Sequence, residues 1–186
     1  MDKKKVAIIG VTGAVGQEFV QSLENHPWFE VTQIAASERS AGKNYLDAIK
    51  DVNGIIAWDV GWEIPEYIKT MTVKSIDELD TSQLDLVFSA VESVAARDIE
   101  TKMAAEIPVI STSSGYRYED DVPILIPGIN DEQTELLEVQ KKNRNWKGWV
   151  APLPNCTTTG LAITLKPLLE KYGAKKVMMT SMQAIS

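Results

Sequence analysis

The chain has 186 residues, 44% of them hydrophobic and 24% charged, with a formal net charge of −7. These values match an average globular domain and exclude a disordered chain, a collagen and a simple repeat. The acidic balance argues against nucleic acid or an anionic membrane as a partner, and no apolar run is long enough to span a bilayer.

The two ends of the sequence and its cysteine count suggest the cellular setting. We expect no signal peptide, because the first residues lack a long apolar stretch. The single cysteine, Cys156, cannot form an internal disulfide, so we expect a reducing, cytoplasmic location. The sequence stops abruptly at Ser186, and we therefore expect it to be part of a longer protein.

The predicted elements alternate between strands and helices. Residues 6–9 form a short apolar strand pattern, followed by a glycine turn, a helix that ends near residue 25, and a second strand over 30–36. Later strands are predicted over 84–88, 107–110, 149–151 and 175–185, and helices over 91–105 and 131–143. Residues 40–70 break the alternation and are expected at the sheet edge. This order predicts an α/β fold with a Rossmann-like, doubly wound parallel sheet.

Three glycines, Gly10, Gly13 and Gly16, occupy the turn between the first strand and the first helix. A diphosphate must approach the backbone closely, and the helix N-terminus then offers it free N–H groups. The spacing is GxxGxxG rather than the familiar GxGxxG, and a turn without a ligand is the alternative. The position between a strand and a helix favours a dinucleotide site.

The end of the second strand indicates which dinucleotide fits. NAD-binding units usually carry an Asp or Glu here for the ribose 2′-hydroxyl, whereas this chain has Ser37, Arg39 and Ser40. Two hydroxyls and a guanidinium suit a 2′-phosphate, so we favour NADP. Glu38 could instead serve a 2′-hydroxyl, and Arg39 could simply face water.

The lone cysteine follows a predicted strand and precedes an apolar stretch of helical character. A thiol at the start of a helix has its thiolate stabilised by the free N–H groups and the dipole, and becomes a nucleophile. A single cysteine is more often a small buried hydrophobic residue. Beside a dinucleotide fold, a thiolate at Cys156 suggests acyl-thioester chemistry.

Five segments in order along the chain resemble aspartate-semialdehyde dehydrogenases, in particular the archaeal and fungal branch. They are Asn-His-Pro-Trp-Phe-Glu at 25–30, Ser-Glu-Arg-Ser-Ala-Gly-Lys at 37–43, Asp-Val-Pro-Ile-Leu-Ile-Pro at 121–127, Pro-Asn-Cys-Thr-Thr at 154–158 and Met-Gln-Ala-Ile-Ser at 182–186. The resemblance implies NADPH-dependent reduction of L-aspartyl 4-phosphate to L-aspartate 4-semialdehyde and phosphate, in aspartate-family amino-acid biosynthesis. It also implies a homodimer or homotetramer at full length and no metal.

The resemblance assigns roles to individual residues. Cys156 matches the nucleophile that carries the thioacyl intermediate, Asn155 its neighbour in the motif, Gln183 the glutamine that orients the substrate, and Arg117 the arginine that binds the phosphate group. A surface salt bridge is the alternative for Arg117. The cofactor residues implied are Gly10, Thr12, Gly13, Ala14, Val15, Gly16, Ser37, Arg39, Ser40, Ser89, Ala90 and Ser186.

The resemblance also implies a division of the chain. Residues 1–155 are expected to form the NADP-binding domain, and residues 156–186 the nucleophile helix and first strand of a catalytic and dimerisation domain whose remainder is absent. The family uses a histidine as general acid/base, but the only histidine, His26, lies in a segment that looks structural. We therefore expect the general acid/base outside this sequence and the chain alone to be inactive.

Two departures from the family pattern bear on the substrate. Thr112 follows Ser111 where the family commonly has Asn, and Gly128 follows Pro127 where it has Glu. Malonyl-CoA and succinyl-CoA reductases, which expel CoA instead of phosphate, are the nearest alternative. A nonenzymatic NADPH-binding module is an alternative of another class. The Asn-Cys-Thr-Thr sequence counts against an N-acetylglutamyl phosphate reductase, which has Gly-Cys-Tyr-Pro.

Overall fold

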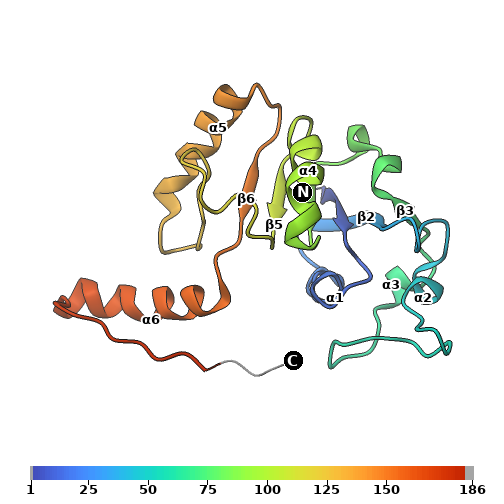
Figure 1. Ribbon diagram of the computed structural model, residues 1–186, viewed down its shortest axis with the longest axis horizontal. Helices are drawn as coiled ribbons and strands as arrows, with labels where there is room; N and C mark the ends of the chain where they lie inside the picture. The colour runs from blue at the N-terminus through green and yellow to red at the C-terminus, as the bar shows by residue number, and fades with distance from the viewer. Residues whose placement is uncertain (1, 183–186) are drawn as a thin grey trace.

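The computed structural model describes residues 2–182 and contains one sheet of six parallel strands (Figure 1). The strands are β1 (Lys4–Ile9), β2 (Phe29–Ala36), β3 (Val73–Ser75), β4 (Leu86–Ser89), β5 (Val109–Ser111) and β6 (Val150–Pro152), in the order β3-β2-β1-β4-β5-β6. The chain therefore starts in the middle of the sheet, builds outward to β3, and returns past β1 to build the other half. The point where the direction reverses, between β1 and β4, is where such sheets bind ligands.

Within the described residues, six α-helices connect and follow the strands. They are α1 (Ala14–Ser22), α2 (Tyr45–Ala48), α3 (Glu66–Lys69), α4 (Ser93–Ala104), α5 (Leu136–Arg144) and α6 (Cys156–Tyr172), with short 3₁₀ turns at Ile76–Glu78, Thr81–Gln83 and Asp131–Glu135. The strand and helix predictions over residues 6–151 are confirmed to within a few residues. β3 was not predicted, because three residues are too few to show a pattern.

The two faces of the sheet carry separate apolar cores, because successive side chains of a strand point to opposite faces. On β1, Val6 and Ile8 pack with Val20 of α1, whereas Ala7 and Ile9 pack in the cluster that includes Met103 of α4. Both faces of the central strands are therefore buried, as the continuous apolar runs of the sequence require.

The segment over residues 40–70 lies at the β3 edge, as predicted, and also contributes to the core. Its backbone joins the sheet edge where the N–H of Gly42 donates to the carbonyl of Val73. Tyr45 and Ile68 are fully buried in the α1-side cluster. The short helices α2 and α3 thus close one end of the sheet.

The predicted strand over 175–185 is wrong for its described part, residues 175–182. No strand is present there, and Figure 1 shows the segment running back from α6 without a neighbouring strand. A strand needs a partner for its backbone N–H and C=O groups, and none of the six described strands lies beside it.

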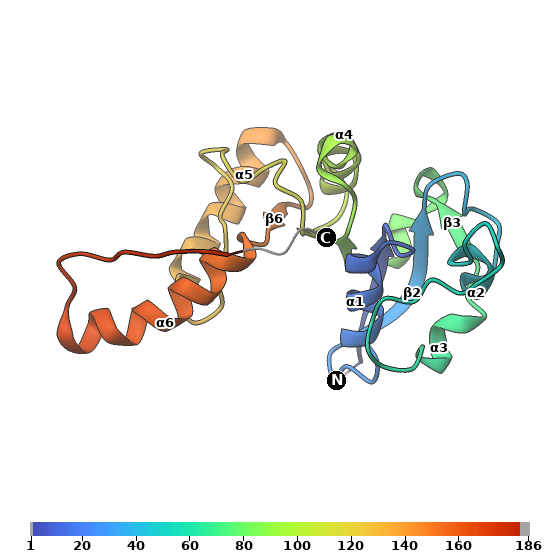
Figure 2. The same ribbon diagram turned by 60° about the horizontal axis from the view of Figure 1, so that its bottom comes forward.

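Helix α6 extends away from the sheet beyond β6 (Figure 2). It has no buried residue, and Ile163, Leu168 and Tyr172 are exposed. A side-chain tie to the rest of the chain is made by Lys166, whose Nζ donates to the carbonyls of Gly128 and Ile129 at 2.8 Å each.

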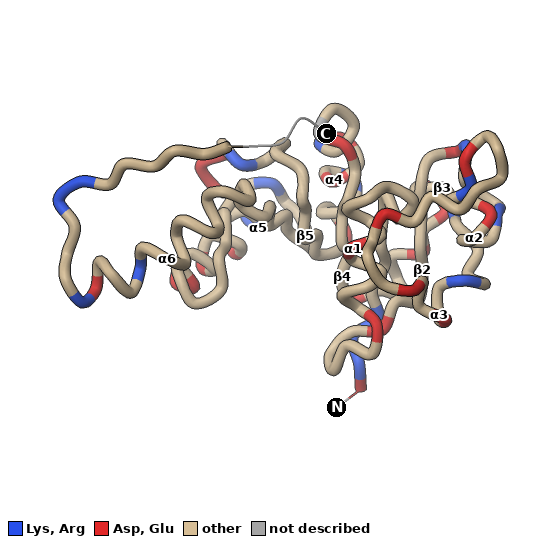
Figure 3. Tube along the Cα trace, turned by 90° about the horizontal axis from the view of Figure 1, so that it is seen from below, with Lys and Arg blue, Asp and Glu red and all other residues tan. Residues whose placement is uncertain are grey.

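Within residues 2–182, no helix combines the length and apolarity needed to cross a membrane. The same residues contain no group of three His, Cys, Asp or Glu side chains that could hold a metal ion. Basic and acidic residues are interspersed along the trace (Figure 3).

Candidate active site

Two of the three turn glycines are required by packing. Gly10 has φ +76°, and a Cβ there would lie 2.5 Å from the carbonyl oxygen of Ala90. A Cβ on Gly16 would lie 2.2 Å from the carbonyl oxygen of Gly10. These glycines bring β1, the loop after β4 and the first turn of α1 into close contact.

Gly13 differs from Gly10 and Gly16, because packing does not require a glycine there. It is the N-cap of α1 with an ordinary φ of −81°, and a Cβ there would meet only the carbonyl oxygen of Gly10, at 3.7 Å. No side chain caps α1 and no acidic residue lies in its first turn, so the N-terminal N–H groups are available to an anion. The turn therefore fits a diphosphate.

A cavity of about 430 Å³ lies beside this turn. Of the predicted cofactor residues, it is lined by Gly10, Thr12, Gly13, Ser37, Arg39 and Ala90. Ala14 and Val15 are exposed in the first turn of α1, outside the lining, and Gly16 is buried beneath it. Ser40 and Ser89 are buried and do not reach this cavity.

The remaining lining was missed at the sequence level. It consists of Ala36, Ile76, Val91, Glu92, Ala95 and Ile99. Ile76 lies in the unpredicted turn after β3. Ile99 lies on α4 and lines the cavity together with Ala36 at the end of β2, a contact that the helix pattern alone does not show. Glu38 lines a second cavity of about 320 Å³, which shares Ala36, Ser37, Ile76 and Ile99 with the first.

Cys156 lies at the other end of the sheet's ligand-binding edge, as the first residue of α6. Asn155 is the N-cap, and its Oδ1 accepts a hydrogen bond from the backbone N–H of Thr157 at 3.0 Å. The sequence Pro-Asn-Cys-Thr-Thr thus builds a capped helix start directly after β6, and leaves the Cys156 side chain exposed.

Arg117 reaches the same place from the loop after β5. Its Nε donates to the carbonyl of Leu153 at 2.9 Å and its Nη2 to the carbonyl of Thr112 at 3.1 Å. The surface salt bridge considered for Arg117 is not formed among the described residues. The guanidinium has further N–H groups beyond these two bonds, since arginine carries five.

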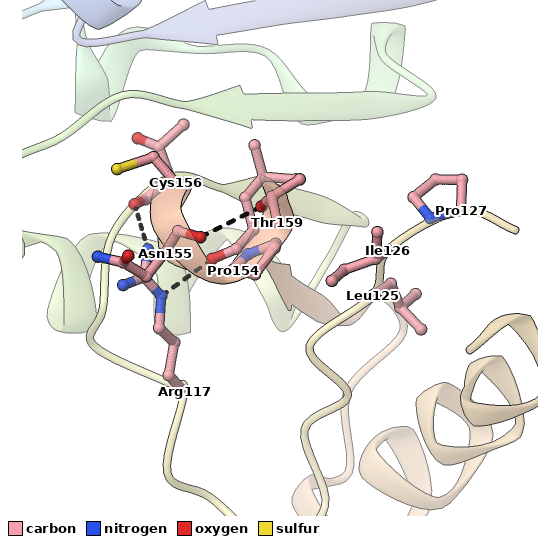
Figure 4. A pocket seen from close by; sticks show the side chains of 10 residues that line it. Arg117, Leu125, Ile126, Pro127, Pro154, Asn155, Cys156 and Thr159 are labelled. Carbon is pink, nitrogen blue, oxygen red and sulfur yellow. Dashed lines mark hydrogen bonds between the residues drawn. The ribbon is translucent and has the colours of Figure 1, made fainter. Parts of the chain in front are cut away.

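Arg117 and Cys156 line one cavity of about 630 Å³. Thr112, Leu153, Pro154, Asn155 and Thr159 complete one side of it, and Leu125, Ile126 and Pro127 the other. Figure 4 shows the guanidinium of Arg117 approaching the Asn155–Cys156 turn, with the apolar wall opposite. An exposed thiol and a guanidinium thus share a largely apolar cavity.

The loop that carries Arg117 is anchored by an aromatic and ionic cluster. The guanidinium groups of Arg97 and Arg144 lie 5.0 and 5.4 Å from the centroid of the buried Tyr116 ring. Arg144 pairs with Asp121 at 2.5 Å, and this hydrogen-bonded pair holds the pKa of Asp121 below its usual value. The cluster fixes the residues on both sides of Arg117.

The two departures from the family pattern have different consequences. Thr112 lines the Cys156 cavity, and its Oγ1 donates to the carbonyl of Ser89 at 3.2 Å. Gly128 has φ +77° and donates its N–H to Asp131 Oδ1 at 2.8 Å. This left-handed conformation suits glycine and disfavours a residue such as Glu.

The remaining predicted residues lie elsewhere. His26 has a structural role, because its Nδ1 accepts from the N–H groups of Trp28 and Phe29 and its ring stacks on Phe29. Gln183 and Ser186 lie outside the described residues.

The sheet order and the uncapped glycine turn define a dinucleotide-binding α/β domain, which is joined to a helix that begins with an exposed cysteine. The family model described as "Semialdehyde dehydrogenase, NAD binding domain" matches residues 5–137. The chain belongs to this family of semialdehyde dehydrogenase NAD-binding domains.

Individual relatives agree with this assignment. The chain is 44% identical to the aspartate-semialdehyde dehydrogenase of Archaeoglobus fulgidus, over 97% of this chain and 50% of that protein. It is 35% identical to the malonyl CoA reductase (NADP) of Metallosphaera sedula, over 98% of this chain and 49% of that protein. The chain thus spans about half the length of these curated relatives.

A solved structure is similar over nearly all of the described chain. The crystal structure of aspartate-semialdehyde dehydrogenase with NADP from Candida albicans matches with a TM-score of 0.77 and 34% identity. The match covers 93% of this chain and 48% of that one.

Proposed function

We propose that this chain is the nucleotide-binding half of an NADP-dependent aspartate-semialdehyde dehydrogenase. The full-length protein would reduce L-aspartyl 4-phosphate to L-aspartate 4-semialdehyde and phosphate, reversibly. The observation that carries the proposal is the single cavity that contains both Cys156 and Arg117. The identity to the Archaeoglobus enzyme supports the same conclusion.

The glycine turn and its cavity fit NADP(H). The backbone at Gly13 and the first turn of α1 would hold the diphosphate, and Ser37 with Arg39 would hold the 2′-phosphate. Glu38 lines the adjoining cavity rather than this one, which supports NADP over NAD. When bound, NADPH supplies the hydride that reduces the acyl group.

The residues of the other cavity would perform the acyl transfer. The Cys156 sulfur attacks the carbonyl carbon of the acyl phosphate, so a C–S bond forms, the C–O bond to phosphate breaks, and phosphate leaves with that electron pair. Arg117 binds the phosphate oxygens, to which a guanidinium presents paired N–H groups. After reduction, the C–S bond breaks and the sulfur leaves as thiolate.

Other parts of the machinery are proposed to lie outside this chain. The only histidine, His26, is engaged in packing, so we place the general acid/base in the half that the relatives have in addition. We also propose that the protein is cytoplasmic and forms a homodimer or homotetramer at full length. Gln183 is proposed to orient the substrate, Ser186 to contact the cofactor, and Asn155 to position the thioacyl group.

Malonyl-CoA or succinyl-CoA reduction is the second candidate, since the Metallosphaera enzyme is 35% identical. A nonenzymatic NADPH-binding module is less well supported, because a packing cysteine would be buried, whereas Cys156 is exposed in a cavity with an arginine.

The test follows NADPH formation from NADP and aspartate semialdehyde in the full-length protein, with phosphate or with CoA as acyl acceptor. We expect phosphate-dependent activity. Activity that requires CoA, and is higher with malonate semialdehyde, would assign the protein to the reductases. No activity with either acceptor would favour the binding module.

A further inference from the structure

A buried carboxylate, Glu100, lies beneath the ligand-binding edge of the sheet without an assigned role. It is on α4 and has no solvent exposure. None of the ion pairs among the described residues involves it. An ionised carboxylate in such a place is unfavourable unless hydrogen bonds compensate for the lost water. Burial raises the pKa of Glu100, and hydrogen bonds from serine hydroxyls lower it.

Three serine hydroxyls converge on this carboxylate. Ser89 and Ser111 donate to Glu100 Oε1 at 2.6 and 2.5 Å, and Ser113 lies 3.3 Å from Oε2. Ser89 ends β4 and Ser111 ends β5, so Glu100 joins the carboxyl ends of two neighbouring strands. The loops that leave these strands carry Ala90 of the cofactor cavity and Thr112 of the Cys156 cavity.

Thr112 is fixed from both sides by this arrangement. Its neighbours in the chain, Ser111 and Ser113, both contact Glu100, and its own N–H and Oγ1 donate to the carbonyl of Ser89 at 3.0 and 3.2 Å. The carbonyl of Thr112 in turn accepts a hydrogen bond from Nη2 of Arg117. Hydrogen bonds joined through the backbone of Ser89 and of residues 111–113 therefore connect Glu100 to the guanidinium of Arg117.

We propose that Glu100 is a positioning residue that holds the ends of β4 and β5 together and thereby aims Arg117 into the Cys156 cavity. The proposal deepens the function proposed above and rests on it for the role of Arg117. Without Glu100, three hydroxyls would be left in a buried site and would find new partners by shifting the loop after β5.

The discriminating variants are E100L and E100Q. Leucine has a size similar to that of glutamate but has no hydrogen-bond acceptor. Glutamine keeps one oxygen, which can accept hydrogen bonds from the Ser89 and Ser111 hydroxyls, and its NH₂ group can donate to the Ser113 hydroxyl. The matched control is Gln33→Leu, which also removes a buried polar side chain. Gln33 lies on β2, on the other side of β1 from Glu100, and its Oε1 accepts hydrogen bonds from Lys74 and Asp80.

The first readout is the NMR signal of the Arg117 Nε–H group, assigned by its absence in Arg117→Lys. It reports the hydrogen bond to Leu153 and is independent of any activity. We expect the Nε–H proton to exchange with solvent about tenfold faster or more in E100L than in the wild type, which is the effect of losing one hydrogen bond to a charged group. In E100Q and in Gln33→Leu, the exchange rate should stay within about twofold of the wild-type rate. Unchanged exchange in E100L, or equal acceleration in E100Q or the control, would overturn the proposal.

If E100L does not fold, Ser111→Ala decides, because it removes one of the two short bonds to Glu100 and leaves the carboxylate in place. Faster exchange at Arg117 supports the proposal, and unchanged exchange overturns it.

A second readout separates this proposal from the proposed function. Inorganic phosphate should slow alkylation of Cys156 by iodoacetamide in the wild-type full-length protein, and about tenfold more phosphate should be needed in E100L than in E100Q. Absence of protection in the wild type contradicts the phosphate role of Arg117, while the NMR result still decides the role of Glu100.

Discussion

Arg117 donates a hydrogen bond from Nε to the carbonyl of Leu153, 2.9 Å away. Leu153 lies between the end of β6 and the helix that begins at Cys156, so this bond ties the loop after β5 to the segment that carries Cys156. The second bond, to the Thr112 carbonyl, fixes the guanidinium plane. The arginine is therefore oriented by the protein backbone before any ligand binds, which lowers the ordering needed on binding.

Replacing Arg117 by Lys should raise the KM for phosphate about tenfold or more in the full-length protein, with a smaller effect on the KM for aspartate semialdehyde. Lysine keeps the charge but cannot make the two backbone bonds in the same plane or present paired N–H groups to phosphate. Steady-state kinetics with each substrate varied in turn measure the effect. An unchanged KM for phosphate would remove Arg117 from phosphate binding.

The glycine turn predicts opposite effects at two positions. Gly16→Ala should lower the melting temperature, because its Cβ would meet the Gly10 carbonyl oxygen at 2.2 Å. Gly13→Val should lower the melting temperature less than Gly16→Ala does, because φ at Gly13 is ordinary and a Cβ there meets only the Gly10 carbonyl oxygen, at 3.7 Å; it should weaken NADPH binding by blocking the diphosphate. Thermal melts and fluorescence titrations measure both properties. Normal NADPH affinity in Gly13→Val would contradict the placement of the diphosphate.

The 2′-phosphate assignment predicts a selective loss. Arg39→Ala should weaken NADPH binding about tenfold to a hundredfold and NADH binding by about twofold or less, since only NADPH carries the extra phosphate. Lys43→Ala removes a nearby exposed cation that lines neither cofactor-side cavity and serves as the control. Equal losses for both dinucleotides in Arg39→Ala would contradict the assignment.

The ion pair between Asp121 and Arg144 predicts a pH dependence of stability. The pKa of Asp121 is lowered in the folded state by the hydrogen bond from Arg144, so the pair stabilises the fold above the unfolded-state pKa of about 4. That stability is lost as the pH falls through the lower folded-state pKa. Asp121→Asn should reduce the free energy of unfolding by about 1–3 kcal/mol at pH 7 and flatten its decline below pH 4. Urea titrations from pH 2.5 to pH 7 test this, and an equally steep decline in the variant would contradict it.

The strand and helix pattern predicted most of the sheet, because both faces of the central strands are buried and leave apolar runs in the sequence. It could not predict β3, whose three residues are defined by pairing with β2. The segment over 175–185 has an apolar strand pattern, but its described part, residues 175–182, forms no strand, since an apolar pattern alone does not provide a pairing partner. Residues 183–186, with Gln183 and Ser186, are not described.

Within the candidate site, local motifs located the glycine turn and the cysteine, because each depends on residues close together in the chain. Sequence could not show that Ser89 faces Glu100 rather than the cofactor cavity, since that depends on contacts between β4 and α4. Ser40 was also expected at the 2′-phosphate, and the structure buries it. The apolar wall of Leu125 and Ile126 likewise follows only from the fold.

The most direct measurement is to find the acyl group on Cys156. Full-length protein is incubated with NADP and aspartate semialdehyde without phosphate, quenched in acid, digested and analysed by peptide mass spectrometry. We expect an aspartyl thioester on the peptide that contains Cys156. The corresponding peptide of Cys156→Ala should carry no acyl group, although this variant should bind NADPH normally. Phosphate added before the quench should remove the acyl group from Cys156. An unmodified Cys156 together with phosphate-dependent turnover, or full activity in Cys156→Ala, would contradict the account.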